Sequence, residues 1–268
     1  MKILCPTDLS SEANNAVAYA AKLAQKTGST LTLLNVQVLA QLTPAEALFG
    51  EEANVQNAQD ILDRQSMEVS ALFKIDCRAV VSSSLISLTS VIKDEAQRYD
   101  LIVMGSDGPD TFVESMSGSK TYKLAAQTDL PILVIPNDVG YSDIRKILFA
   151  FDYRRIRNIP MKQITSLARL TSAEIVMLQI VEEGWSREAE TEISAAQTKI
   201  IETWPNTGTL KFQTVFASDH DESLKHFISS FNADVVAIGY HSRGGIFDKS
   251  KTRQIVAGAS YPLLVVHS

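Results

Sequence analysis

The stretch KILCPTD at residues 2–8 returns as KILFAFD at residues 146–152, and this repetition determines how the rest of the chain is interpreted. Three further segments recur in the same order: residues 29–36 as 173–180, 100–105 as 234–239, and 129–136 as 260–267. Self-similarity in a constant order indicates two copies of one structural unit. We therefore expect two domains, residues 1–138 and 144–268, joined by a short linker rich in Asn, Asp, Gly and Ser.

Each copy alternates apolar segments with segments of helical periodicity. In the first copy the apolar segments begin near residues 3, 30, 77, 100 and 131. Strands that are apolar throughout and separated by helices are typical of a parallel sheet covered on both faces. The sequence therefore predicts an α/β fold with two tandem, doubly wound, five-stranded parallel sheets. Ser10 or Ser11 can cap the first helix, and Gly28 suits its end.

The composition is that of a globular protein, with 45% apolar residues, 21% charged residues and a formal charge of −6. No basic run favours nucleic acid, and no apolar run approaches the roughly 20 residues that span a membrane. The N-terminus does not resemble a signal peptide. Cys5 and Cys77 form no disulfide framework, and Cys5 is expected to be a buried, inert thiol. The absence of a disulfide framework, a signal peptide and a membrane-length apolar run leads us to expect a cytoplasmic protein. The four histidines show no metal-ligand spacing, so we expect no protein-held metal.

The stretch MGSDGPDTFVESMSGSKT at residues 104–121 carries the candidate site. It is not a P-loop, because Ser119 separates Gly118 from Lys120 and the segment follows the fourth strand rather than the first. Glycines after a strand let backbone approach a ligand, and the N-terminus of a following helix favours an anion. The sequence thus indicates a phosphate cradle made mostly of main chain. The alternative is a strand-to-helix connection that only needs flexible residues.

The spacing Gly-x2-Gly-x9-Gly-Ser, after LIVMG and before LPILVIP, resembles the nucleotide-binding signature of the universal stress protein family. The opening ILCPTDLSSEANNAVAYAAKLA is similar to that family's first strand and helix. The resemblance covers nearly the whole chain and is stronger in the first copy. It implies a Rossmann-like fold related to the adenine nucleotide alpha hydrolases, with the two copies packed as a pseudo-dimer. Two chains could also form a homodimer.

The resemblance implies that the first copy binds ATP or AMP. Asp8 would lie near adenine and ribose, and Val36 would contact the adenine edge through its backbone. The remaining contacts would come from Pro6, Thr7, Met104, Gly105, Gly108, Gly118, Ser119 and Lys120. The chemistry of the residue also supports a ribose contact for Asp8, because a carboxylate at the end of a strand can accept hydrogen bonds from ribose hydroxyls. Its alternative role is to cap the following helix.

Two acidic residues depart from the family pattern. Asp107 lies between the first two glycines, and Asp110 follows nearby. Carboxylates beside phosphates weaken binding unless a cation intervenes. We therefore expect that Mg²⁺ accompanies the nucleotide, that triphosphate affinity is reduced, or that the ligand carries less charge.

The second copy lacks most of the cradle. Ser242 replaces the second glycine, Lys249 and Ser250 replace Gly118 and Ser119, and the loop is three residues shorter. We expect a degenerate site kept for structure and pairing. The alternative is that Arg243, Lys249 and Lys251, which keep the region basic, still bind an anion. For the whole chain the leading hypothesis is a nucleotide-binding protein with a stress-response or regulatory role. The alternatives are a weak ATP hydrolase and a nucleotide-independent scaffold for protein contacts.

Overall fold

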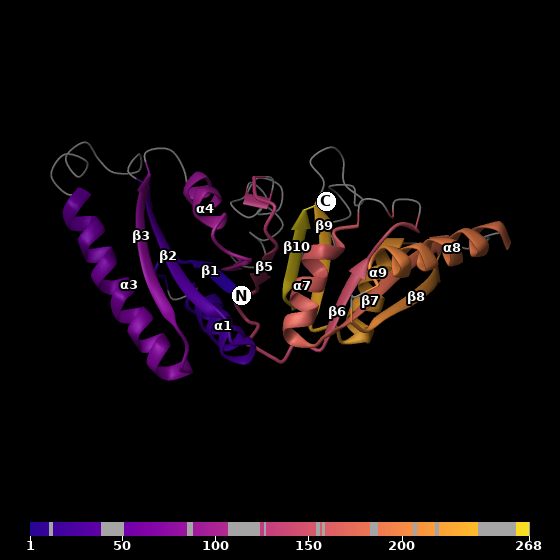
Figure 1. Ribbon diagram of the computed structural model, residues 1–268, viewed down its shortest axis with the longest axis horizontal. Coiled ribbons are helices and arrows are strands. Elements are labelled where there is room, and N and C mark those ends of the chain that lie inside the picture. Colours follow the sequence, from indigo (N-terminus) through magenta and orange to yellow (C-terminus); the bar gives the residue numbers. More distant parts are fainter. Residues whose placement is uncertain are drawn as a thin grey trace. The chain divides into compact units, whose positions relative to one another are not determined.

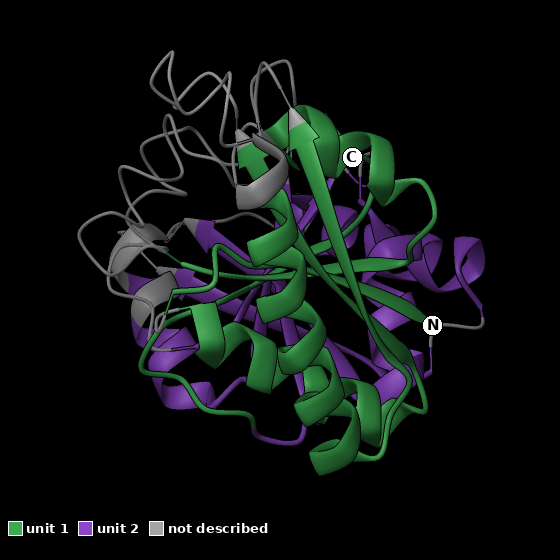
Figure 2. Cartoon of the chain, turned by 90° about the vertical axis from the view of Figure 1, so that its left-hand side faces the viewer, with its two compact units in different colours: residues 1–141 green, residues 142–268 purple. Residues whose placement is uncertain are grey.

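The computed structural model describes residues 1–10, 13–38, 51–84, 88–106, 124–125, 127–153, 156, 159–182, 187–205, 208–217, 220–240 and 261–267. The chain divides into two compact units, Met1–Tyr141 and Ser142–Ser268 (Figure 2). We call them unit 1 and unit 2. The domain bounds expected from the sequence repeat stay a prediction.

Unit 1 is a parallel α/β sheet with strands in the order β3-β2-β1-β4-β5. Its described elements are β1 (Lys2–Pro6), α1 (Ala13–Thr27), β2 (Thr30–Val38), α3 (Glu51–Phe73), β3 (Cys77–Ser84), α4 (Leu88–Ala96), β4 (Leu101–Gly105) and β5 (Ile132–Ile135) (Figure 1). Neighbouring strands in this order all pair in parallel. The predicted doubly wound fold is confirmed.

The central strands of unit 1 carry its core because both faces of the sheet are covered. Ile3, Leu4 and Cys5 of β1 are all 0% exposed, as is Ile102 of β4. Helices α1 and α3 contact each other as well as the sheet, so they share one face. Right-handed crossovers place α4, which connects β3 back to β4, on the opposite face.

Helix α1 begins and ends as its sequence predicts. The Ser10 hydroxyl accepts a hydrogen bond from the Ala13 amide at 3.1 Å, as an N-cap side chain should. At the other end Gly28 adopts φ +64°, and the Ser29 amide donates to the Ala24 carbonyl at 2.9 Å. Glycine adopts this left-handed conformation without a Cβ clash.

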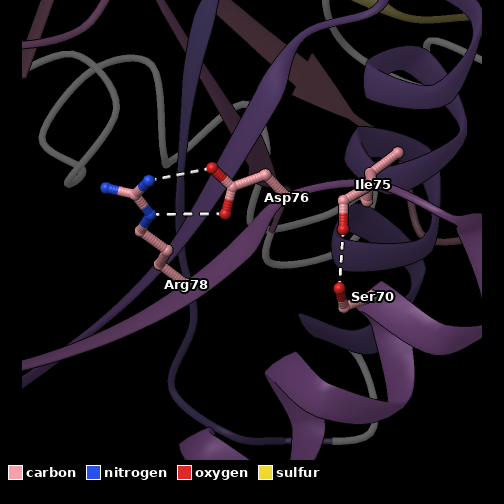
Figure 3. A network of polar contacts seen from close by, with 4 residues as sticks. All are labelled: Ser70, Ile75, Asp76 and Arg78. Atoms are coloured by element: carbon pink, nitrogen blue, oxygen red, sulfur yellow. Dashed lines mark hydrogen bonds and ion pairs between the residues drawn. The ribbon is translucent and has the colours of Figure 1, made fainter.

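The turn from α3 to β3 is closed by polar contacts (Figure 3). Lys74 adopts φ +56°, and the Ser70 hydroxyl donates to the Ile75 carbonyl at 2.6 Å. Arg78 donates two hydrogen bonds to the Asp76 carboxylate, at 2.9 and 3.3 Å. This ion pair is well exposed, so it adds little to stability.

Unit 2 repeats the topology of unit 1, with strands in the order β8-β7-β6-β9-β10. Its described elements are β6 (Lys146–Ala150), α7 (Met161–Thr171), β7 (Glu174–Glu182), α8 (Arg187–Thr203), β8 (Leu210–Ala217), α9 (His220–Phe231), β9 (Val235–Tyr240) and β10 (Leu263–His267) (Figure 1). The register repeats as well: Gly105 aligns with Ile135 in unit 1, and Gly239 aligns with Val266 in unit 2.

One carboxylate contact is also duplicated at the amino edge of each sheet. The Asp100 carboxylate accepts from the Lys2 amide at 2.8 Å, and the Asp234 carboxylate accepts from the Lys146 amide at 2.9 Å. In each unit this contact ties the start of the first strand to the start of the fourth. The sequence repeat is therefore a structural repeat down to single hydrogen bonds.

Candidate functional site

The candidate site of unit 1 lies where the strand order reverses, between β1 and β4. From β1 the chain moves outward to β2 and β3, then crosses back to β4 and β5. The β1–β4 pairing aligns Ile3 with Leu101 and Leu4 with Ile102 and goes no further, although the strands run on to Pro6 and Gly105. The two strands thus part at their carboxyl ends. Ligands of doubly wound sheets bind at such a switch point.

The loop after β1 forms one side of the candidate site. Thr7 is 6% exposed, and its amide donates to the Leu34 carbonyl at 2.9 Å. The Thr7 hydroxyl accepts from the Leu9 amide at 3.1 Å, and the Asp8 carboxylate accepts from the Ser10 amide at 3.0 Å. Two successive side-chain turns therefore hold the exposed Asp8 at the edge of the sheet.

These contacts bear on the alternative role of Asp8 as a helix cap. The α1 amide at Ala13 bonds to Ser10, whereas the Asp8 carboxylate accepts from an amide in its own loop.

The backbone of the same loop is strained at Leu9. This residue, between Asp8 and Ser10, adopts φ +67°, which is costly for a branched, bulky residue. Backbone strain of this kind persists where the surroundings fix it, and it is enriched at functional sites.

The β2 side of the site contains Val36, which is partly exposed. The last β1–β2 pair joins Pro6 to Leu34, so Val36 lies two residues beyond it, next to the loop that carries Asp8. Its neighbour Asn35 is buried and donates from Nδ2 to the Thr7 carbonyl at 2.9 Å. Asn35 was not among the predicted site residues. The signal available in the sequence is an amide residue at the same place in both copies, Asn35 and Gln179.

The β4 side contains Met104, Gly105 and Ser106. Met104 and Ser106 are 9% and 7% exposed, and the Ser106 amide donates to the Ile135 carbonyl at 3.0 Å. A Cβ added at Gly105 would lie 3.7 Å from the Ala16 Cβ, an ordinary van der Waals distance. Among the described residues, neither backbone conformation nor packing requires glycine here. The absence of a side chain at Gly105 would let a ligand approach the main chain closely.

The structure brings together Pro6, Thr7, Asp8, Val36, Met104 and Gly105 at one edge of the sheet. Gly108, Gly118, Ser119 and Lys120 lie outside the described residues, as do Asp107, Asp110 and the start of the helix expected at Gly118. No group of three His, Cys, Asp or Glu side chains that could hold a metal is found in the described part of the chain. Nor does any helix described there have the length and apolarity to cross a membrane.

Unit 2 places different side chains at the equivalent edge. Asp152 follows β6 as Asp8 follows β1, but Phe151 and Tyr153 stand at the positions of Thr7 and Leu9. Phe151 and Tyr153 are 4% and 8% exposed, and the Phe151 ring meets Phe212 edge to face at 6.4 Å. The loop after β6 thus packs by aromatic burial where the loop after β1 uses hydroxyl and carboxylate turns.

Both thiols of unit 1 are held in the protonated form. Burial raises the pKa of Cys5 to about 12, with a smaller contribution from Cys77. Burial also raises the pKa of Cys77 to about 11, and the nearby Asp76 carboxylate adds to this rise. The expectation that Cys5 is a buried, inert thiol agrees with its complete burial.

The fold defines a doubly wound α/β protein with its candidate ligand site at the switch point of the first sheet. The chain belongs to the universal stress protein family, whose family model matches residues 1–136, just over half of the 268 residues. No curated protein matches the chain significantly.

Two solved structures that cover nearly the whole chain agree with the fold. A universal stress protein from Archaeoglobus fulgidus is 17% identical with a TM-score of 0.74, covering 99% of this chain and 98% of its own. A functionally unknown protein from Pseudomonas aeruginosa is 16% identical with a TM-score of 0.61, covering 99% and 92%. A universal stress protein from Archaeoglobus fulgidus in complex with dAMP is 15% identical with a TM-score of 0.38, covering 47% and 99%.

Proposed function

We propose that unit 1 binds an adenine nucleotide, ATP or AMP, at the switch point between the carboxyl ends of β1 and β4. Asp8 would accept hydrogen bonds from the ribose, the Val36 backbone would meet the adenine edge, and Gly105 would let main chain approach the ligand. The phosphates would lie on the segment from Gly108 to Lys120. Membership of the universal stress protein family supports this assignment.

The single observation that carries the proposal is the parting of β1 and β4 beyond Leu4 and Ile102. The pairing ends at the switch point, where Asp8 follows one strand and Gly105 ends the other. Among the described residues nothing about conformation or packing requires that glycine, and the carboxylate is held by its own loop. Together these features are typical of a small polar ligand site on a doubly wound sheet.

The first test is calorimetric titration of the full chain with ATP and AMP, each with and without Mg²⁺, and with dAMP and adenosine. We expect saturable binding of at least one adenine nucleotide. A gain for ATP in the presence of Mg²⁺ would support a role for the cation beside Asp107 and Asp110. Absence of heat and of any melting shift at millimolar nucleotide would refute the proposed function, because ligand that binds only the folded state must stabilise it.

Gly105→Ala and Gly239→Ala form the matched test of the site. Both substitutions fit the described structure, since the new Cβ meets Ala16 at 3.7 Å in the first case and nothing within 4 Å in the second. We expect Gly105→Ala to weaken nucleotide binding by about tenfold or more, equivalent to about 1.4 kcal/mol. Gly239→Ala should leave affinity unchanged. Equal affinities for both variants would place the nucleotide elsewhere.

Phosphate release measured in the same samples separates binding from the weak ATP hydrolysis that the sequence left open. Turnover that stays at the wild-type rate in Gly105→Ala at subsaturating ATP, where weaker binding should lower it, would indicate a contaminant. The regulatory role in stress, the cytoplasmic location, the pairing of the two copies and any homodimer stay predictions of the sequence.

A further inference from the structure

Asn35 is a deeply buried polar residue at the carboxyl edge of the unit 1 sheet, with 3% of its surface exposed. Its side chain makes two hydrogen bonds there. Nδ2 donates to the Thr7 carbonyl at 2.9 Å, and Oδ1 accepts from Nε2 of Gln37 at 2.5 Å. A buried amide with both ends satisfied has a fixed orientation, because turning it would leave both partners unpaired.

Thr7 is the residue through which Asn35 reaches the site. The Thr7 amide bonds to the Leu34 carbonyl, its carbonyl bonds to Asn35, and its hydroxyl accepts from the Leu9 amide. All three of its polar groups are thereby held. The direction in which the chain leaves β1 is fixed, and the next residue is Asp8.

Unit 2 shows what a longer side chain does at this position. Gln179, 4% exposed, occupies the place of Asn35 but bonds a different point of the loop. Its Oε1 accepts from the Tyr153 amide at 2.9 Å, and its Nε2 donates to the Ile180 carbonyl at 3.1 Å. Tyr153 is equivalent to Leu9 rather than to Thr7. The amide at this position and the shape of the loop therefore change together between the two units.

We propose that Asn35 is a positioning residue for the nucleotide site: its amide holds the Thr7 carbonyl and thereby fixes the Asp8 carboxylate in its ligand-binding place. This inference rests on the proposed function of unit 1. It assigns no ligand contact to Asn35 itself, which acts through the loop.

Asn35→Leu tests the proposal because leucine keeps the volume and removes the donor to Thr7. Of ATP and AMP, the nucleotide that binds the wild-type protein more tightly is used. We expect the affinity of Asn35→Leu for it to fall by about tenfold or more, as for Asp8→Ala. The Asn35→Leu/Asp8→Ala double variant should bind no more weakly than Asp8→Ala alone, because both changes remove the same interaction between Asp8 and the nucleotide. Additive losses, or wild-type affinity in Asn35→Leu, would overturn the proposal.

Gln179→Leu is the matched control. It removes the equivalent buried amide from unit 2, so it shares the general destabilisation, yet it should leave nucleotide affinity unchanged. A loss of affinity equal to that of Asn35→Leu would show a nonspecific effect and count against the proposal.

Hydrogen exchange without ligand separates this inference from the proposed function. In Asn35→Leu the Leu9 and Ser10 amides should exchange about tenfold faster, while β3 and β4 keep their protection. Unchanged exchange at both amides overturns the inference alone, whereas wild-type protein without nucleotide binding overturns the proposed function. If Asn35→Leu does not fold, Asn35→Gln replaces it. That variant displaces the amide by one methylene, so a few-fold loss is expected and unchanged affinity contradicts the proposal.

Discussion

Single residues distinguish the equivalent strand ends of the two units. Asp8 and Asp152 follow equivalent strands, and Gly105 and Gly239 occupy equivalent register positions. The difference lies beside them. Thr7 turns its hydroxyl to the Leu9 amide, whereas Phe151 is buried against an aromatic ring. The loop after β1 therefore holds Asp8 by local hydrogen bonds, whereas the residues beside Asp152 are buried aromatic side chains.

The buried thiol of Cys5 predicts a loss of stability at alkaline pH. Its pKa rises from an ordinary value of 9.0 to about 12 in the folded protein, mainly because of burial. Above pH 9 the unfolded chain loses this proton while the folded chain keeps it, so stability falls as pH rises from 9 toward 12. Between pH 9 and pH 10 the loss from this group is about 1 kcal/mol.

Urea denaturation of wild type and Cys5→Ala at pH 7, 9 and 10 measures this effect. The readout is the slope with pH rather than the absolute stability, which the smaller side chain also lowers. Wild type should lose more stability than Cys5→Ala between pH 9 and pH 10. Tyr261, whose pKa burial raises from 10.0 to about 12, contributes in the same direction to both proteins. Parallel slopes would contradict the assignment.

At the scale of elements, the ends of α1 and α7 differ in one informative residue. Each helix is followed by a left-handed residue, Gly28 at φ +64° and Ser172 at φ +57°. The amide after it donates in both cases to a helix carbonyl, at 2.9 and 2.8 Å. We expect Gly28→Ala to destabilise unit 1 by about 1 kcal/mol and Ser172→Gly to stabilise unit 2 by up to about 1 kcal/mol.

Denaturation can follow the two changes separately. Both tryptophans, Trp185 and Trp204, belong to unit 2, so tryptophan fluorescence reports Ser172→Gly. Hydrogen exchange of α1 reports Gly28→Ala. A stabilising Gly28→Ala or a destabilising Ser172→Gly would show that these residues do not bear the strain expected of their backbone.

The elements themselves could be predicted from the sequence because their signals are local. Apolar runs such as residues 100–105 have the length of buried strands, and Gly28 and Ser10 match the chemistry of helix ends. The left-handed Leu9 and Ser172 could not be predicted in this way. Such conformations in residues other than glycine are imposed by tertiary contacts, which local propensity does not contain.

The candidate site was predictable in part for the same reason. Asp8, Val36 and Gly105 carry recognisable patterns, and the structure places them at one edge. Asn35 has no such pattern, because its role depends on a hydrogen bond to a loop 28 residues away in the sequence. Only comparison of the two copies would have shown that an amide recurs at this position.

At the scale of the whole molecule, the fold is duplicated but the residues at the two strand ends differ, and this difference predicts how many nucleotides each chain binds. Unit 2 keeps the topology and the register of unit 1, but its loop after β6 is packed with Phe151 and Tyr153. We expect about one nucleotide per chain in a calorimetric titration. Asp8→Ala should abolish most of the signal and Asp152→Ala should not. Two equivalent sites per chain would show that the second copy has kept its function.

A crystal structure of the full chain grown with millimolar AMP or ATP would decide whether the switch point of unit 1 holds the nucleotide. We predict a nucleotide at the carboxyl ends of β1 and β4, with its ribose within hydrogen-bond distance of the Asp8 carboxylate and nothing equivalent beside Asp152. Water alone between Asp8 and Gly105, or a nucleotide bound only in unit 2, would contradict this prediction.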